Sequence, residues 1–195
     1  MHLTATHITA LKTLIDQGSS QAADVLNMMT GSDIRLQVPS VSMLDARDEK
    51  NGRSNDQVSA VQLGFQGSFS GISLLIFSLD DSAQLTMALT GEEPASPGFD
   101  DLRIEALTEV GNMVLNGVMG SIGNTLQQRL EYALPVYHEA SIDHLLGPRT
   151  PGNDTAALIG QTQFTIEQLD FDGVIILVFT SDSAQALVAA LDNLS

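Results

Sequence analysis

The sequence of 195 residues contains no cysteine and no tryptophan, and it lacks any long hydrophobic run. Without cysteine the chain can form no disulfide, no thiolate zinc site and no cysteine nucleophile. The longest apolar run, 174–179, has the length of a strand and is too short to cross a bilayer. The N-terminal residues lack the basic start and apolar stretch of a secretion signal. These absences predict a soluble protein of the cytoplasm.

Basic residues are scarce as well. Lysine and arginine number 8 against 24 aspartate and glutamate residues, which gives a formal net charge of −16. Such a charge repels phosphate backbones and anionic lipid headgroups, so we expect neither a nucleic acid nor a membrane surface as a partner. It favours a partner with a basic surface. Hydrophobic residues make up 43% of the chain, which is enough for a packed core.

The chain repeats its own pattern once. The sequence Asp-Ser-Ala-Gln at 81–84 recurs letter for letter at 182–185, and Pro39 has a counterpart in Pro135. The two offsets are 101 and 96 residues, so the second half has gained about five residues in its middle loop. A period near 100 residues is too long for a solenoid. It indicates a duplicated unit.

Each half is predicted to form the same series of elements. Apolar residues recur every three or four positions in the expected helices and alternate with polar residues in strands. Asp80 and Asp81 are expected to cap the short helix of the first half, and Gly91 to end it. The expected elements are helix 8–30, strand 34–44, loop 45–58, strands 61–71 and 72–77, helix 81–91, helix 100–130, strand 131–140, a loop with Gly147, Pro148, Pro151 and Gly152, strands 156–168 and 172–180, and helix 181–191.

These elements predict an α+β fold for residues 1–195. We expect a single pseudo-twofold domain of two repeats, about 1–92 and 98–195, joined by a linker at 91–99. Because the strands of each repeat can bury a face only against helices, one mainly antiparallel or mixed sheet should carry the two long helices packed together on one side.

The helix at 100–130 has a narrow polar stripe. At about 100° per residue, Glu105, Glu109, Asn112 and Asn116 all fall within about 40° of one direction. Any amphipathic helix has a solvated polar face, and that is the simplest interpretation of the stripe. Two details favour a functional role. Asparagine is a poor helix former, and two glutamates four residues apart repel each other mildly without a lysine nearby.

Other catalytic and ligand-binding patterns are missing. The histidines at 2, 7, 138 and 144 are scattered and have no paired-ligand spacing, so no metal site is expected. The stretch Gly-Ser-Phe-Ser-Gly at 67–71 has phenylalanine at its centre and is therefore no nucleophile elbow. The chain has neither a P-loop nor a dinucleotide-binding glycine motif.

Around the polar stripe the sequence resembles the CheC, CheX and FliY family of chemotaxis phosphatases, which act on the response regulator CheY. The signature of that family is Asp or Ser, three residues, Glu, two residues, Asn, then twenty-two residues and Pro. Here Glu109, Asn112 and Pro135 keep this spacing, and Glu105 departs from the family at the first position. The first half resembles the same repeat, but it carries Thr13 and Asp16 where the motif has Glu and Asn.

The resemblance implies a function and a set of roles. Asn112 would orient the water that attacks the aspartyl phosphate of a CheY-type receiver, and Glu109 would pair with the active-site lysine of that receiver. Pro135 would be a structural member of the motif. The receiver's own acidic residues would hold Mg²⁺, so this chain needs no metal or other cofactor. Around the two catalytic residues, the expected partner-binding residues are Glu105, Asn116, Met119 and Gly120, with Gly123 also allowing close approach.

Two alternatives remain open on the sequence alone. The chain could be a non-catalytic adaptor that binds a receiver or another chemotaxis or flagellar protein, or it could be a structural part of the flagellar switch. An adaptor has no need of a carboxamide at Asn112, which favours the enzyme. The sequence leaves open whether a CheD-like activator binds as a second partner, and whether Thr13 and Asp16 keep any binding role.

Overall fold

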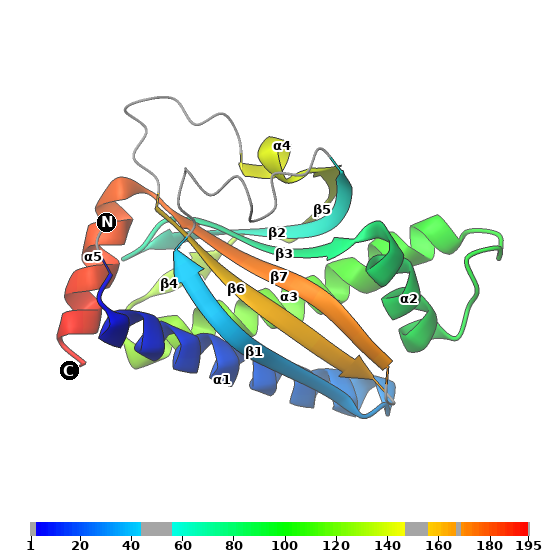
Figure 1. The fold of residues 1–195 in the computed structure, drawn as a ribbon, viewed down its shortest axis with the longest axis horizontal. Helices are drawn as coiled ribbons and strands as arrows, with labels where there is room; N and C mark the ends of the chain where they lie inside the picture. Colours follow the sequence, from blue (N-terminus) through cyan, green and yellow to red (C-terminus); the bar gives the residue numbers. More distant parts are fainter. Residues whose placement is uncertain (1–2, 44–55, 147–155, 167–168, 195) are drawn as a thin grey trace.

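A computed structural model describes residues 3–43, 56–146, 156–166 and 169–194 of the chain (Figure 1). The predicted loop at 45–58 lies outside these residues, apart from its last positions, and so do Gly147, Pro148, Pro151 and Gly152. The elements are α1 (Ala5–Thr30), β1 (Ile34–Met43), β2 (Gln57–Gly67), β3 (Gly71–Ser78), α2 (Leu79–Thr90), α3 (Phe99–Thr125), β4 (Leu130–Tyr132), β5 (Val136–Ser141), α4 (Ile142–Leu146), β6 (Ala156–Ile166), β7 (Leu169–Phe179) and α5 (Ser181–Asp192).

The strands of both halves form one sheet. Its order is β1-β6-β7-β3-β2-β4, with β5 also paired to β2, and every described pairing is antiparallel. The first strand of each half pairs with the other half: β1 lies beside β6, whereas β4 and β5 lie beside β2. The predicted α+β fold with one mainly antiparallel sheet is therefore confirmed, and neither half has a sheet of its own.

A pseudo-twofold axis passes between β3 and β7 at the centre of the sheet. The 101-residue offset between the two halves relates Leu74 to Ile175 and Leu75 to Ile176. The structure pairs Leu74 with Ile176 and Leu75 with Ile175, so the rotation exchanges these two pairs. The helices follow the same symmetry, because α2 packs on α3 and α5 packs on α1.

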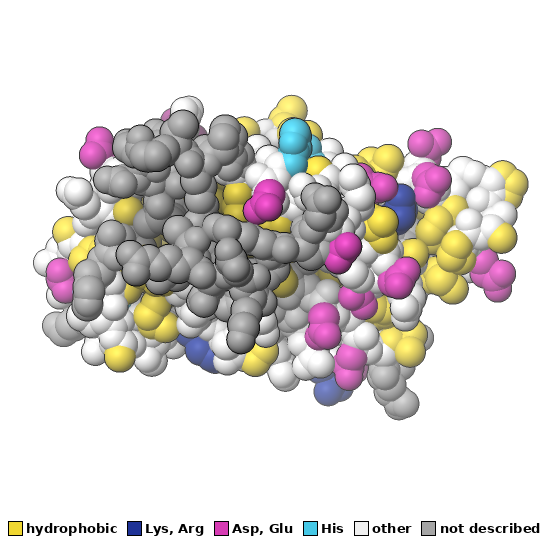
Figure 2. Space-filling view, turned by 45° about the horizontal axis from the view of Figure 1, so that its top comes forward, with side chains coloured by type: hydrophobic (Ala, Val, Ile, Leu, Met, Phe, Trp, Pro, Cys, Tyr) yellow, Lys and Arg dark blue, Asp and Glu magenta, His cyan; other side chains and the backbone are white. Residues whose placement is uncertain are grey.

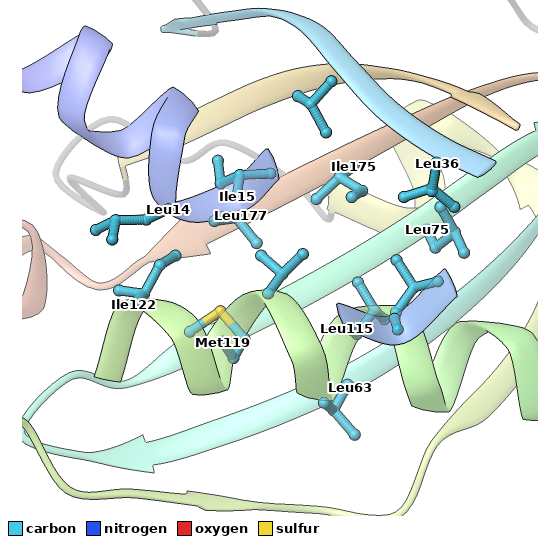
Figure 3. Close-up of a cluster of buried hydrophobic side chains, with 14 of the residues drawn as sticks. Leu14, Ile15, Leu36, Leu63, Leu75, Leu115, Met119, Ile122, Ile175 and Leu177 are labelled. Carbon is cyan, nitrogen blue, oxygen red and sulfur yellow. The ribbon is translucent and has the colours of Figure 1, made fainter. Parts of the chain in front are cut away.

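The two long helices pack against each other on one face of the sheet, as Figure 1 shows. They approach most closely where Gly18 of α1 meets Gly117 of α3: a Cβ on either glycine would collide with the carbonyl oxygen of the other. Leucine, isoleucine and valine side chains fill the space between the helices and the sheet (Figure 3). The labelled residues of this core are Leu14, Ile15, Leu36, Leu63, Leu75, Leu115, Met119, Ile122, Ile175 and Leu177.

Three local predictions need correction. Helix α2 begins two residues earlier than expected, and its N-cap is Ser78, whose hydroxyl accepts a hydrogen bond from the backbone N–H of Asp81. Helix α3 ends at Thr125 rather than near 130, because Gln127 adopts a left-handed conformation with φ of 55°. The strand expected at 131–140 is broken into β4 and β5 around Pro135, which has no N–H to donate to a neighbouring strand.

Candidate functional site

The polar stripe of α3 faces outward. Glu105 and Glu109 are exposed, and Asn112, Asn116 and Gly120 are half-buried. Ten positions of the helix are buried, and Val114 and Val118 are among those that belong to the core between the helices and the sheet. The structure thus brings five of the expected residues together on one accessible helix face.

Glycine fixes the position of this face relative to the sheet. A Cβ at Gly111 would lie 2.5 Å from the Cβ of Val61, so α3 rests directly on β2 at the residue before Asn112. Side chains of ordinary size would hold the helix farther from the strand. The backbone beneath Asn112 is therefore set by contact with β2 of the sheet rather than by a loop.

The carboxamides of Asn112 and Asn116 are joined to each other. The Nδ2 of Asn116 donates to the Oδ1 of Asn112 at 2.7 Å and to the backbone oxygen of Asn112 at 2.8 Å. The two glutamates of the stripe, unlike these asparagines, have no partner side chain among the described residues. Glu105 and Glu109 form no hydrogen bond or ion pair with any residue that the structure describes, so both carboxylates are available to a partner.

The arginine of α3, Arg103, is already paired. The Nη2 of Arg103 lies 3.1 Å from the Oε2 of Glu139 in β5 and 3.3 Å from the Oδ1 of Asp100. Its side chain is only 15% exposed. Arg103 thus ties the N-terminal part of α3 to the edge of the sheet and leaves the stripe carboxylates without a neutralising cation.

The same place in the first half has different bonds. Asp16, the counterpart of Asn112, accepts a hydrogen bond at 3.0 Å from the backbone N–H of Val38 in β1. Thr13, the counterpart of Glu109, donates its hydroxyl to the backbone oxygen of Thr9. A shallow groove of about 580 Å³ between α1 and β1 includes Asp16, Val38 and Pro39. Asp16 is thus tied to β1, whereas Thr13 is exposed and bonds only within its own helix.

The second half lacks the bond between helix and strand. The 96-residue offset makes Leu134 the counterpart of Val38, and Leu134 lies in the break between β4 and β5 with 85% of its surface exposed. No bond joins Asn112 to Leu134 in this part of the structure. Pro135, the structural residue of the motif, is half-buried in the same break. The bond that ties Asp16 to β1 therefore has no counterpart in the second half.

Two sequence-based assignments at this face are wrong. Met119 is fully buried in the core between α3, α1 and the sheet, so it cannot contact a partner (Figure 3). Gly123 is buried as well, and a Cβ there would meet the backbone oxygen of Gln128 and the side chain of Leu130. Gly120 keeps its expected property, because nothing lies within 4 Å of a Cβ built on it.

The charge of the site comes from carboxylates. Among the described residues no three histidine, aspartate or glutamate side chains gather in a way that could hold a metal ion. Burial raises the pKa of the Tyr132 hydroxyl in β4 above its ordinary value. Figure 2 shows one face of the molecule with acidic side chains spread across it and basic ones sparse.

Sequence comparison gives one significant curated relative. No protein-family model matches the chain. It is 24% identical over 130 residues to CheC1 of Halobacterium salinarum, a protein whose name proposes CheY-P phosphatase activity. The matched region covers 66% of this chain and 66% of CheC1, which is just under two thirds of the length of that relative. None of the helices in the described part of the chain is long and apolar enough to cross a membrane.

Solved structures share the fold at low sequence identity. FliY of Thermotoga maritima superposes with a TM-score of 0.74 at 17% identity, covering all of both chains. The FliM middle domain of H. pylori gives a TM-score of 0.66 at 8% identity, with 96% of this chain and 99% of that domain covered. A chain of the CheX–CheY–BeF3–Mg complex of Borrelia burgdorferi gives 0.54 at 15% identity, with 85% and 97% covered.

The chain is thus similar in sequence to a CheC protein, and it shares its α+β fold with FliY, with a FliM middle domain and with a chain of the CheX–CheY complex.

Proposed function

We propose that this chain dephosphorylates the aspartyl phosphate of a CheY-type receiver in chemotaxis signalling. The observation that carries the proposal is the contrast between the two halves: Asn112 bonds only within its own helix and Glu109 is exposed one turn before it, whereas Asp16 is bonded to β1 and an exposed threonine stands at position 13. Support also comes from the CheC1 similarity and from the fold that the chain shares with a CheX–CheY complex.

The chemistry suits an uncharged side chain on a rigid support. An aspartyl phosphate is a reactive acyl phosphate, so catalysis depends on placing water in line with the phosphorus rather than on a strong base. The oxygen of the water bonds to phosphorus as the bond from phosphorus to the carboxylate oxygen breaks, which releases inorganic phosphate and the free aspartate. In this proposal the carboxamide of Asn112 holds the water, and Gly111 beneath it keeps the backbone fixed against Val61.

Glu109 is proposed to dock the receiver. It lies one turn before Asn112 on the same face, exposed and without an ion pair among the described residues, so its charge is available to a lysine of the partner. Mg²⁺ would be held by carboxylates of the receiver, and this chain would bring no cofactor of its own. Glu105 and Gly120 extend the same face in the two directions along the helix.

The structural similarity to FliM gives weight to a second candidate. A FliM middle domain shares this fold over 96% of the chain, and another solved FliM occurs in a complex with FliG. The chain could accordingly be a non-catalytic adaptor that binds a receiver or a flagellar-switch protein. This candidate needs the docking face of α3 but no carboxamide at position 112.

A phosphate-release assay tests the proposal and separates it from the adaptor. Receivers encoded by the same cell are phosphorylated with a small acyl or amido phosphate, and phosphate release is followed with and without this chain. Acceleration of release on one receiver is the expected result. Binding to the phosphorylated receiver without acceleration would establish the adaptor instead. Adding a CheD-like protein to the same assay shows whether it is an activator.

A further inference from the structure

The bonds between Asn116 and Asn112 fix which end of the Asn112 carboxamide faces outward. The backbone oxygen of Asn112 can only accept a hydrogen bond, so the Asn116 atom 2.8 Å away must be the donor Nδ2. The same Nδ2 lies 2.7 Å from the side chain of Asn112, and a donor there requires the Oδ1 of Asn112 as its acceptor. The usual ambiguity between the two ends of an amide is therefore removed at both residues.

We propose that Asn116 is a positioning residue for Asn112, and this inference rests on the proposed phosphatase function. One lone pair of the Asn112 Oδ1 is taken by Asn116, and the other can accept a proton of the attacking water. The Nδ2 of Asn112 is turned away from Asn116 and keeps both of its N–H groups for the phosphoryl oxygens or the water. The carboxamide thus meets the receiver in one orientation.

The inference changes the role that the stripe alone suggested for Asn116. Spacing along the helix places Asn116 among the partner contacts, equivalent to Glu105. In the structure it is half-buried, and its Nδ2 is engaged within its own helix. Without the Nδ2 donor of Asn116, the Asn112 amide can turn by 180° about its Cβ–Cγ bond. The positions of its Oδ1 and Nδ2 are then exchanged in half of its orientations.

The test is a comparison of Asn116→Ala, Asn112→Ala and the double variant in receiver dephosphorylation. Maximal rate and half-saturating receiver concentration are measured separately, together with the affinity for a beryllofluoride-loaded receiver. For Asn116→Ala we expect the maximal rate to fall about fivefold or more, because one hydrogen bond is lost. The half-saturating receiver concentration and the affinity for the beryllofluoride-loaded receiver should not change. The double variant should be no slower than Asn112→Ala, because Asn116 acts only through Asn112.

Two further variants serve as a control and as a second way to remove the donor. Asn124→Ala removes an exposed carboxamide from the end of the same helix and should leave all three quantities unchanged. Asn116→Asp preserves the size of the side chain but cannot donate when ionised, so it should lose at least as much rate as Asn116→Ala. Alanine is the better helix former, so neither folding nor circular dichroism should suffer in the alanine variant.

The outcomes distinguish failure of the positioning role from failure of the proposed function. If Asn112→Ala is slow and Asn116→Ala is as fast as the wild type, the positioning role is wrong and the proposed function stands. If Asn116→Ala weakens affinity instead of the maximal rate, Asn116 is a partner contact and the inference is overturned. If Asn112→Ala itself hydrolyses at the wild-type rate, the role of Asn112 in the proposed function fails first.

Discussion

The carboxylate of Asp16 in α1 accepts a hydrogen bond at 3.0 Å from the backbone N–H of Val38 in β1. Symmetry relates this pair to Asn112 and Leu134, which form no such bond; Asn112 is joined to Asn116 instead, and Leu134 is exposed. One duplicated motif position has therefore become a link between helix and strand, while the other faces outward. This difference between the halves leads to the following predictions.

Replacing Asp16 should affect stability and not activity. Asp16→Ala leaves the N–H of the buried residue Val38 without its acceptor, which should lower the free energy of unfolding by about 1–2 kcal/mol. Urea denaturation measures the change. Asp24→Ala, at an exposed position of the same helix, is the matched control and should shift stability by less than about 0.5 kcal/mol. An Asp16 variant of wild-type stability would show that the link to β1 contributes nothing.

Two glycines of α3 should respond in opposite ways to alanine. In Gly117→Ala the new methyl group meets the backbone of Gly18, so α1 and α3 must separate, at a cost of about 1–3 kcal/mol. In Gly120→Ala the methyl group enters open space, and the better helix propensity should raise stability by up to about 1 kcal/mol. Thermal unfolding of the two variants gives the comparison.

Gly120→Ala also tests where the receiver docks. If the partner approaches α3 closely at Gly120, the added methyl group should weaken binding of a beryllofluoride-loaded receiver although the fold is unharmed. Titration calorimetry on the variant and the wild type measures this. Unchanged affinity would place the receiver elsewhere along the helix.

Association with the receiver should depend on salt. The chain carries a net charge of −16, and the carboxylates of Glu105 and Glu109 have no ion pair among the described residues. Raising ionic strength from about 0.01 M to 0.15 M shortens the Debye length from about 30 Å to about 8 Å, so the association rate should fall severalfold. Stopped-flow mixing at a series of salt concentrations gives the slope. A rate that does not change with salt would mean that the acidic charge does not steer the encounter.

Much of this arrangement could be predicted from the sequence. The periodicity of apolar residues gave the helices and strands, and the repeated Asp-Ser-Ala-Gln segment predicted the pseudo-twofold sheet that β3 and β7 form at its centre. The placement of Glu105, Glu109, Asn112 and Asn116 on one accessible face also follows from helical spacing, because side chains three and four residues apart share a face.

Other features depend on packing that spacing does not contain. Met119 lies at the edge of the polar stripe, but α3 is covered by both the sheet and α1, so its buried arc is wider than that of a helix covered on one side. The contact between Gly18 and Gly117 brings α1 close to this residue. Similarly, alternation of apolar residues continues through 131–140, and only Pro135 signals the break between β4 and β5.

The most direct test of the central claim is the dephosphorylation rate of one receiver by the wild type, Asn112→Ala and Asp16→Ala under saturating conditions, with circular dichroism as the folding control. If Asn112 places the attacking water, Asn112→Ala should still bind the receiver but lose up to about a hundredfold in rate, while Asp16→Ala keeps the rate of the wild type. A fast Asn112→Ala together with an inactive, folded Asp16→Ala would contradict the account, because the working site would then lie in the first half.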